Sequence, residues 1–305
     1  EILGFNDKSG TRWKFCAIPL GGYVKFFGDR NVFSQAEQEE LLKEYNEEDR
    51  KKLFVVKPLY QRSLIVAAGP FANFLLAIVI FAFIYMFAGK DFTPAQIQEV
   101  QSESPAYVAG IKSGDVIQSI NNREVKSIME VSTFINASSS ETIDIEVLRN
   151  GNELTLQVKP KFIEGKDSLG NQINKKIIGI KVTPLNEEIN RQRLGPATAL
   201  YYAIKETWFV IEASWDFVIS MFKGTGDTSQ LGGPIKIAKI TGQVAKFGIV
   251  AFLSIMAYIS ISLGFINLFP IPMLDGGHLM FYAFEKILGR PLTQRTPVSY
   301  THLTL

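Results

Sequence analysis

The sequence lacks what a disulfide-rich or nucleic-acid-binding protein needs. It holds one cysteine, Cys16, which excludes an intramolecular disulfide framework and a four-cysteine zinc site. With 32 basic and 30 acidic residues the net charge is +2, so no nucleic-acid footprint is present. The chain also opens without an initiator methionine, a signal peptide or an apolar first segment. We therefore expect a fragment that begins inside a folded unit.

Long apolar runs, in contrast, are abundant. Hydrophobic residues make up 47% of the chain and 23 residues are phenylalanine, a composition typical of a protein that lies partly in lipid. Residues 63–88 carry no charge and exceed the roughly 20 residues needed to cross a bilayer. A second uncharged run, 247–269, is predicted to cross back. Basic residues before the first run predict that this end lies in the cytoplasm: Lys51, Lys52, Lys57 and Arg62.

A third apolar stretch, residues 196–222, is interrupted by charge. Four charged residues argue against a helix that crosses lipid: Lys205, Glu206, Glu212 and Asp216. The pattern favours an amphipathic helix at the membrane surface or against the core. Its apolar material is Trp208, Phe209, Trp215 and Phe222.

The second uncharged run closes on a polar segment, which reads Asn267-Leu-Phe-Pro270-Ile-Pro272-Met-Leu-Asp275-Gly-Gly-His278. A carboxylate at membrane depth is expensive and usually faces a cavity, a partner or a metal. Two prolines break or kink the helix, so the backbone must be buried in protein or line a pocket. Asp275 is therefore predicted to be the functional group of this segment.

Residues 3–27 alternate like β-strands around the turn signal Asp7-Lys-Ser-Gly10, which predicts a β-hairpin. The second strand leads into Pro19-Leu-Gly21-Gly22-Tyr23-Val-Lys25. Paired glycines indicate either an ordinary tight turn or a close approach by another backbone.

The first apolar run contains Gly69-Pro-Phe-Ala-Asn73. A glycine, a proline and an amide let a neighbouring helix approach closely and supply an interhelical hydrogen bond. A packing notch and a place beside a catalytic centre are both consistent with these residues.

Between residues 95 and 184 the chain changes to short strands and polar turns, among them a type I′ hairpin signal at Asn150-Gly151. The order of segments resembles a bacterial, circularly permuted PDZ domain. That resemblance implies capture of peptide ends or strands by β-addition. The candidate binding loop is Ile178-Gly179-Ile180, although an ordinary strand is the reading that a lone glycine between isoleucines favours.

The motif Asn-x-x-Pro-x-Pro-x-Leu-Asp-Gly-Gly-His resembles the third-ligand motif of the site-2 protease family of intramembrane zinc metalloproteases, and most closely its RseP type. Three further segments resemble sequence motifs of this family and occur in the same order along the chain: Pro-Leu-Gly-Gly-Tyr-Val-Lys, Gly-Pro-x-Ala-Asn and Leu231-Gly-Gly-Pro-Ile235. The resemblance covers the chain to about residue 295. It implies a multi-pass protease of the bacterial inner membrane that cuts transmembrane segments of proteins already trimmed, such as anti-sigma factors or signal peptides.

The resemblance also implies a Zn²⁺ site, with Asp275 as one ligand. In the family, two histidines and a general-base glutamate come from a His-Glu-x-x-His helix, which this sequence does not contain; its histidines are His278 and His302. We therefore expect no catalytic residue in this chain, the missing helix upstream of Glu1, and an inactive polypeptide. His278 is expected to hydrogen-bond backbone rather than bind metal.

Substrate contacts are implied in the same way. Asn73 is expected beside the metal, and Asn267, Pro270 and Pro272 are expected to hold an extended segment there. The loop at Gly21, Gly22 and Tyr23 is expected to pair with the unwound substrate as an added strand. Expected partners are transmembrane substrates, membrane lipid and peptide ends bound by the PDZ-like domain.

Two other classes of function are consistent with the residues. One is a non-catalytic membrane scaffold that captures peptides through the PDZ-like domain. The other is a transporter or channel accessory in which Asp275 lies on an ion pathway.

The predicted fold is a multi-pass α-helical membrane core with a membrane-associated β-hairpin and one inserted α+β PDZ-like domain, placed on the periplasmic side. Its expected parts are the hairpin and polar connector (1–62), a transmembrane helix (63–90), the PDZ-like domain (91–186), an amphipathic helical connector (187–246), a transmembrane helix with the metal-ligand motif (247–295), and a tail that is not native sequence (296–305).

Overall fold

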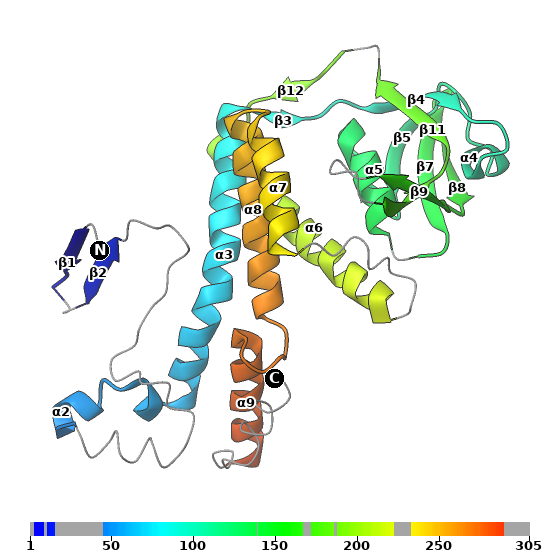
Figure 1. Ribbon diagram of the computed structural model, residues 1–305. Helices are drawn as coiled ribbons and strands as arrows, with labels where there is room; N and C mark the ends of the chain where they lie inside the picture. The colour runs from blue at the N-terminus through cyan, green and yellow to red at the C-terminus, as the bar shows by residue number, and fades with distance from the viewer. Residues whose placement is uncertain are drawn as a thin grey trace. The chain divides into compact units, whose positions relative to one another are not determined.

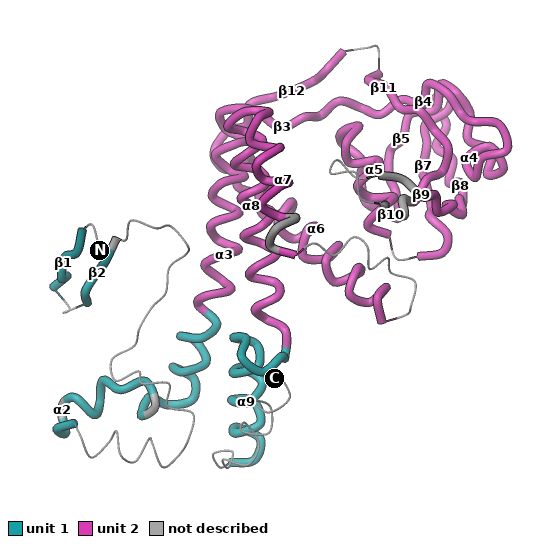
Figure 2. The backbone as a smooth tube through the Cα atoms, in the orientation of Figure 1, with its two compact units in different colours: residues 1–67, 270–305 teal, residues 68–269 magenta. Residues whose placement is uncertain are grey.

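A computed structural model describes residues 3–8, 11–15, 45–138, 140–166, 172–185, 188–222 and 233–289. It divides into two compact units, residues 1–67 with 270–305 and residues 68–269 (Figure 2).

Two helices of the structure are long and apolar enough to cross a membrane. They are α3 (Leu59–Phe87) and α8 (Ile249–Asn267), with mean hydropathies of 2.4 and 2.3. Only 17% and 22% of their most apolar stretches are buried. Helix α3 begins four residues before the predicted start, because Pro58 opens its first turn and accepts hydrogen bonds from the amides of Gln61 and Arg62.

In the larger unit, α8 packs with α3, with α6 (Pro196–Phe222) and with α7 (Pro234–Ala245) (Figure 1). Small residues dominate the contact: Ala77 of α3, Ala199 and Ala203 of α6, and Ala257 of α8 are fully buried. Alanines at these crossings let the helix backbones approach closely, as in membrane helix bundles.

The PDZ-like domain (residues 95–185) is built on a six-stranded antiparallel sheet of order β11-β4-β5-β7-β8, with β6 paired to β5. The strands are β4 (Ala95–Val100), β5 (Val116–Ile120), β6 (Arg123–Glu124), β7 (Ile143–Arg149), β8 (Asn152–Val158) and β11 (Ile180–Pro184). Two helices accompany them, α4 (Pro105–Val108) and α5 (Ile128–Ala137), and a separate ribbon joins β9 (Lys161–Lys166) to β10 (Gln172–Ile177). Alternating side chains of β7 form the core: Ile143, Ile145 and Val147 are fully buried.

The predicted turn between β7 and β8 is confirmed. Asn150 and Gly151 both have positive φ angles, 51° and 84°, as a type I′ turn requires. The paired register runs from Ile143–Val158 to Arg149–Asn152 without interruption.

A short ribbon forms where the chain enters and leaves the domain, a feature that the sequence did not predict. Strand β3 (Lys90–Asp91) pairs with β12 (Arg191–Gln192), although 100 residues separate them in sequence. The amide of Phe92 donates to the carbonyl of Asn190 at 2.7 Å and continues the pairing. The sheet itself therefore starts at Ala95, after the predicted boundary at residue 91.

The smaller unit contains the predicted hairpin, as β1 (Leu3–Asn6) paired with β2 (Arg12–Phe15). The Asp7 carboxylate closes its loop by accepting from the Thr11 amide at 2.9 Å. Helix α2 (Glu47–Arg50) and a short 3-10 helix (Phe54–Val56) precede α3. Gly21, Gly22 and Tyr23, and the tail 296–305, lie outside the described residues.

The described part of the predicted segment 247–295 forms two helices, with the break that the two prolines predicted. Helix α8 ends at Asn267, and α9 (Asp275–Leu288) begins eight residues later. The break contains Pro270 and Pro272, whose rings cannot continue an α-helix.

Candidate metal and substrate sites

Asp275 is the first residue of α9, directly after the N-cap Leu274. A carboxylate at this end is stabilised by the helix dipole and by the free amides of the first turn. The side chain is half-buried, and within the described residues its carboxylate has no ion pair. Asp275 is therefore held at a helix end with its charge available to a ligand.

The segment before Asp275 is a tight turn, so the expectation of an extended strand is wrong. The Leu274 amide donates to the Ile271 carbonyl at 3.1 Å, and Met273 has a φ of 78°. Proline at the second position and a positive φ at the third are the signature of a type II turn. Pro272 thus reverses the chain in the segment for which the family resemblance implied an extended conformation.

Gly277 explains how this turn is fixed against α9. A Cβ atom there would lie 2.3 Å from the Ile271 carbonyl oxygen and 2.9 Å from its carbon. Real Cβ atoms do not approach backbone so closely, so the turn can rest on the helix only at a glycine. Gly276 and Gly277 are both buried. The motif Leu-Asp-Gly-Gly therefore packs the turn onto the helix and sets the place of Asp275.

The other end of α9 is anchored to the start of α3. The Arg62 guanidinium donates to Glu285 at 3.3 Å and lies 5.0 Å from the centre of the Tyr282 ring. Its Nε also donates to the Lys57 carbonyl at 3.1 Å. Both partners of the ion pair are largely buried, with exposed side-chain fractions of 22% and 18%.

In the larger unit, the predicted notch on α3 is present. A Cβ at Gly264 of α8 would lie 3.0 Å from the Pro70 carbonyl and 3.2 Å from the Asn73 Cβ, so the two backbones meet there. The interhelical hydrogen bond differs from the one expected: the Ser260 hydroxyl donates to the Asn73 main-chain carbonyl at 2.8 Å. The side-chain amide of Asn73 does not make this bond. Asn267 is the last residue of α8.

The candidate peptide-binding loop departs from strand geometry at its first two residues. Gly179 has a φ of 81°, and a Cβ there would lie 2.3 Å from the Cβ of Ser104. The carbonyls of Ile178 and Gly179 accept from Ala106 and Gln101, both at 2.9 Å. The reading as an ordinary strand is therefore wrong for Ile178 and Gly179, and holds from Ile180, where β11 begins.

Strand β11 is an edge of the six-stranded sheet. It pairs with β4 on one side, and within the described residues no strand covers its other side. A free strand edge offers unpaired amides and carbonyls to an added peptide strand.

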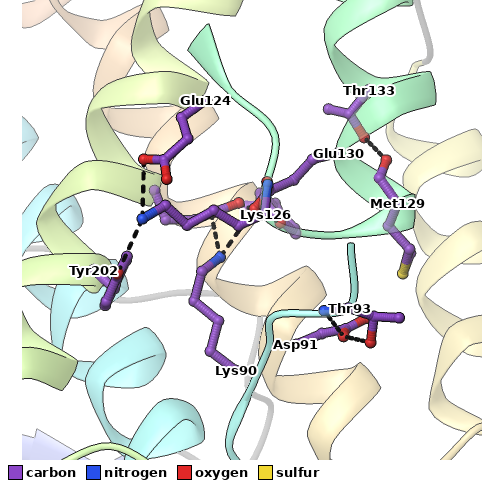
Figure 3. A network of polar contacts seen from close by, with 11 residues as sticks. Lys90, Asp91, Thr93, Glu124, Lys126, Met129, Glu130, Thr133 and Tyr202 are labelled. Atoms are coloured by element: carbon purple, nitrogen blue, oxygen red, sulfur yellow. Dashed lines mark hydrogen bonds and ion pairs between the residues drawn. The ribbon is translucent and has the colours of Figure 1, made fainter. Parts of the chain in front are cut away.

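A polar junction that no sequence pattern predicted joins the PDZ-like domain to the helices of its own unit (Figure 3). Lys90 donates to Glu130 of α5 at 3.1 Å and lies 3.9 Å from Glu206 of α6. Lys126 donates to the Tyr202 hydroxyl at 3.3 Å and pairs with Glu124 at 3.0 Å. These residues are spread over more than a hundred positions, so no local pattern indicates them.

Among the described residues, Asp275 has the chemistry of one zinc ligand. Catalytic zinc sites generally use three protein ligands and an open position. Among the described residues, no group of three His, Cys, Asp or Glu side chains is close enough to hold a metal. The carboxylate of Asp275 has suitable chemistry and the freedom from competing ion pairs that a ligand needs.

Comparison with known proteins extends over nearly the whole chain. Peptidase family M50 matches residues 1–303. A Mesorhizobium japonicum protein named "Putative zinc metalloprotease mll0638" is 40% identical over 298 residues, covering 97% of this chain and 80% of its own length. The metalloprotease MmpA of Caulobacter vibrioides is 33% identical over 312 residues, covering 95% and 78%.

Among solved structures, the PDZ domain of an SdrC-like protein from Listeria monocytogenes is similar over 30% of this chain and 88% of its own. Its sequence identity is 21% and the TM-score is 0.24. The family match and the identity to named metalloproteases show that this chain belongs to peptidase family M50, the site-2 protease family of zinc metalloproteases, and is a membrane protein.

Proposed function

We propose that this protein is an intramembrane protease that cleaves transmembrane segments of membrane proteins already trimmed by another enzyme, with anti-sigma factors or signal peptides as the substrate class. One observation carries the proposal. The turn at residues 271–274 packs on Gly277 and holds Asp275 at the start of a helix. Such a carboxylate suits a metal ligand better than a solvent-exposed role.

The depth of Asp275 supports cleavage within the membrane. At about 1.5 Å per residue, Asp275 lies roughly 15 Å along α9 from Glu285. Glu285 pairs with Arg62, which belongs to the basic cluster that marks the membrane boundary. Because the hydrocarbon core is about 30 Å thick, a helix α9 that runs along the membrane normal would bring the carboxylate near mid-depth.

Zinc supplies, when bound, a water that ionises near pH 7 and can attack a peptide bond. Asp275 is the residue of this chain that would hold it. The two remaining ligands and the general base are expected in residues outside this sequence, since it holds only His278 and His302. The main-chain amide of His278 donates to the Leu274 carbonyl and so forms part of the first turn of α9.

Substrate capture would use strand pairing at two places. A transmembrane helix must lose its internal hydrogen bonds before cleavage, which is costly in lipid unless new partners are supplied. The loop at Gly21, Gly22 and Tyr23 is proposed to pair with the unwound substrate at the first of these places. Beside the metal, the proposed residues are Asn73, Asn267, Pro270 and Pro272. The edge of β11, after Ile178, Gly179 and Ile180, is proposed to bind peptide ends. With its basic end in the cytoplasm, α3 would place the PDZ-like domain in the periplasm of a bacterial inner membrane.

The test is cleavage of a single-span substrate with a short periplasmic stub, by the full-length protein in lipid vesicles. Asp275→Asn is expected to abolish cleavage, and Glu188→Gln, an exposed acid outside the helices, to leave it unchanged. Gly277→Ala is expected to reduce cleavage strongly while keeping the carboxylate, because it displaces the turn. Full cleavage by Asp275→Asn would overturn the proposal. So would a protein without substitutions that captures peptides but cleaves none, which is the result expected of a scaffold.

A further inference from the structure

Met273 has a backbone conformation that its side chain disfavours. Its φ of 78° lies in the left-handed region, where the third position of a type II turn is normally glycine or asparagine. The other described residues with a positive φ that are not glycine are Asn121, Asn122, Asn150 and Glu103, so Met273 is the only apolar member of this described group. Departures of this kind from local preference cluster at functional sites. The side chain of Met273 therefore requires a reason beyond the formation of the turn.

Packing within the chain does not supply that reason. The Met273 side chain is 82% exposed and belongs to neither buried cluster of the described residues. The contact that fixes the turn on α9 is made by the backbone of Ile271 at Gly277, so it needs no side chain at position 273. Ile271, on the other side of Pro272, is also exposed, at 51%. The turn thus presents apolar side chains to its surroundings from a backbone that is held in place.

Met273 is also close to the candidate metal ligand. It stands two residues before Asp275, so the Cα atoms of the two residues lie within about 7 Å of each other. Leu274, between them, is fixed on both sides: its amide donates to Ile271, and its carbonyl accepts from Gly277 at 3.0 Å. An extended peptide advances about 3.3 Å per residue. A substrate whose peptide bond reaches a metal on Asp275 therefore brings the neighbouring side chain within reach of Met273.

We propose that Met273 contacts the substrate side chain next to the scissile peptide bond and determines which residues are accepted there. Hydrolysis needs water at the site, so covering an exposed thioether side chain with apolar surface is favourable. Methionine is unbranched and polarizable, and it adapts to apolar partners of different shapes. The expected preference is for large apolar residues, such as leucine and phenylalanine, over serine. This inference rests on the proposed function and adds a determinant of its specificity.

The test compares variants of Met273 on a matched series of substrates. The full-length protein in lipid vesicles is given single-span substrates that carry leucine, phenylalanine or serine next to the mapped cleavage site. Met273→Gly and Met273→Asn suit the turn but lack the apolar side chain. Both are expected to lower kcat/KM for the leucine and phenylalanine substrates by about tenfold or more, and to change that for the serine substrate little. Met273→Leu keeps an apolar side chain and is expected to stay within about threefold of the unsubstituted protein.

Zinc content separates a substrate contact from support of the metal site. Met273→Gly is expected to hold as much zinc as the unsubstituted protein, because glycine adopts the positive φ without strain. An unchanged substrate preference in Met273→Gly would overturn the inference and leave the proposed function intact. Loss of zinc from this variant, or an equal fall in the cleavage of all three substrates, would also overturn it, since Met273 would then act on the metal site. Absence of cleavage by the unsubstituted protein would overturn the proposed function as well.

Disulfide cross-linking tests the contact without cleavage. Met273→Cys is combined with Cys16→Ser, which removes the native cysteine, and with Asp275→Asn, which is expected to leave the substrate uncut. A substrate cysteine next to the cleavage site is expected to cross-link to position 273. Ile287→Cys is the matched control in the same background, since Ile287 is 78% exposed in the last turn of α9. Cross-linking at position 273 that is no stronger than at position 287 would overturn the inference.

Discussion

The PDZ-like domain and the pair α3 and α8 bury their apolar residues in opposite ways. In the domain, Ile97, Ile120, Ile143 and Ile145 are completely buried. In α3, large side chains face outward, with Phe71 and Leu75 each 63% exposed. The domain is thus stabilised by its own core in water. The helices bury little and depend on lipid around them and on close backbone contacts between them. Substitutions in the domain should therefore act mainly through its buried core, and substitutions in the helices mainly through the close contacts between their backbones.

The largest effect is expected at Asp115, a buried carboxylate in the domain. It accepts two hydrogen bonds from Arg149, each 2.7 Å, and one from the Lys112 amide at 2.9 Å. Asp115→Ala leaves the Arg149 guanidinium without its carboxylate partner and is expected to cost the domain about 3 to 5 kcal/mol. Hydrogen exchange of the β5 and β7 amides measures this loss. Glu141→Ala removes an exposed pair with Lys159 and should leave exchange unchanged.

The same residue predicts the domain's response to acid. Burial alone would raise the pKa of Asp115, but the hydrogen bonds from Arg149 and Lys112 outweigh it, so the pKa lies below its ordinary value of 3.8. A lowered pKa in the folded state stabilises the domain above that ordinary value, and the contribution disappears as the pH falls through the folded-state pKa. Exchange protection should therefore decline below about pH 4 and decline less in Asp115→Asn.

Gly179→Ala comes next. Its φ of 81° disfavours any side chain, and the new Cβ would also meet Ser104 at 2.3 Å. Strain and overpacking together should cost roughly 2 to 4 kcal/mol and weaken the peptide binding that we propose for β11. Gly151→Ala separates backbone strain from overpacking, because its φ is also positive, at 84°, while nothing lies within 4 Å of the new Cβ. Equal losses in the two variants would show that the contact with Ser104 is not tight.

Between the membrane helices the effect should be smaller. Gly264→Ala brings a Cβ to 3.0 Å from the Pro70 carbonyl and the Phe74 ring, and should destabilise the helix pair by about 1 to 3 kcal/mol. Gly242→Ala in α7 has open space and should stabilise slightly, as alanine does inside helices. Thermal denaturation in detergent micelles compares the two variants. A stabilising Gly264→Ala would contradict the close contact at the notch.

The smallest effect is expected at the base of α9. Arg62→Lys keeps the charge but loses the bond to Glu285 and the stacking on Tyr282. The loss should be roughly 1 kcal/mol, seen as faster hydrogen exchange along α9. Unchanged exchange would show that the ion pair does not anchor the helix.

The fold was largely predictable from local signals. Uncharged length identified α3 and α8, and Asn150-Gly151 identified the β7–β8 hairpin, because each depends on neighbouring residues only. The ribbon of β3 and β12 was missed, since strands of two residues lack any alternation. The split between α8 and α9 follows from Pro270 and Pro272, but their turn depends also on Met273 at a positive φ, which the sequence does not reveal.

The sequence could propose residues for the candidate site but not their geometry. Asp275 was proposed from its place after an apolar run. The reason for Gly277, a backbone contact with Ile271, appears only in three dimensions. Likewise, the charges of α6 predicted a helix at the membrane surface or against the core, but not that Glu212 and Asp216 pair with Arg123, about ninety residues away in sequence. Pairing between distant residues is the part that sequence patterns do not contain.

The metal content of the full-length protein tests the central claim most directly. Purified protein and its Asp275→Asn and Glu188→Gln variants are compared by elemental analysis after dialysis against a weak chelator. We predict a single bound zinc ion in the parent and in Glu188→Gln, and a severe loss in Asp275→Asn. Equal zinc in all three proteins, or none in the parent, would contradict the assignment of Asp275 as a ligand.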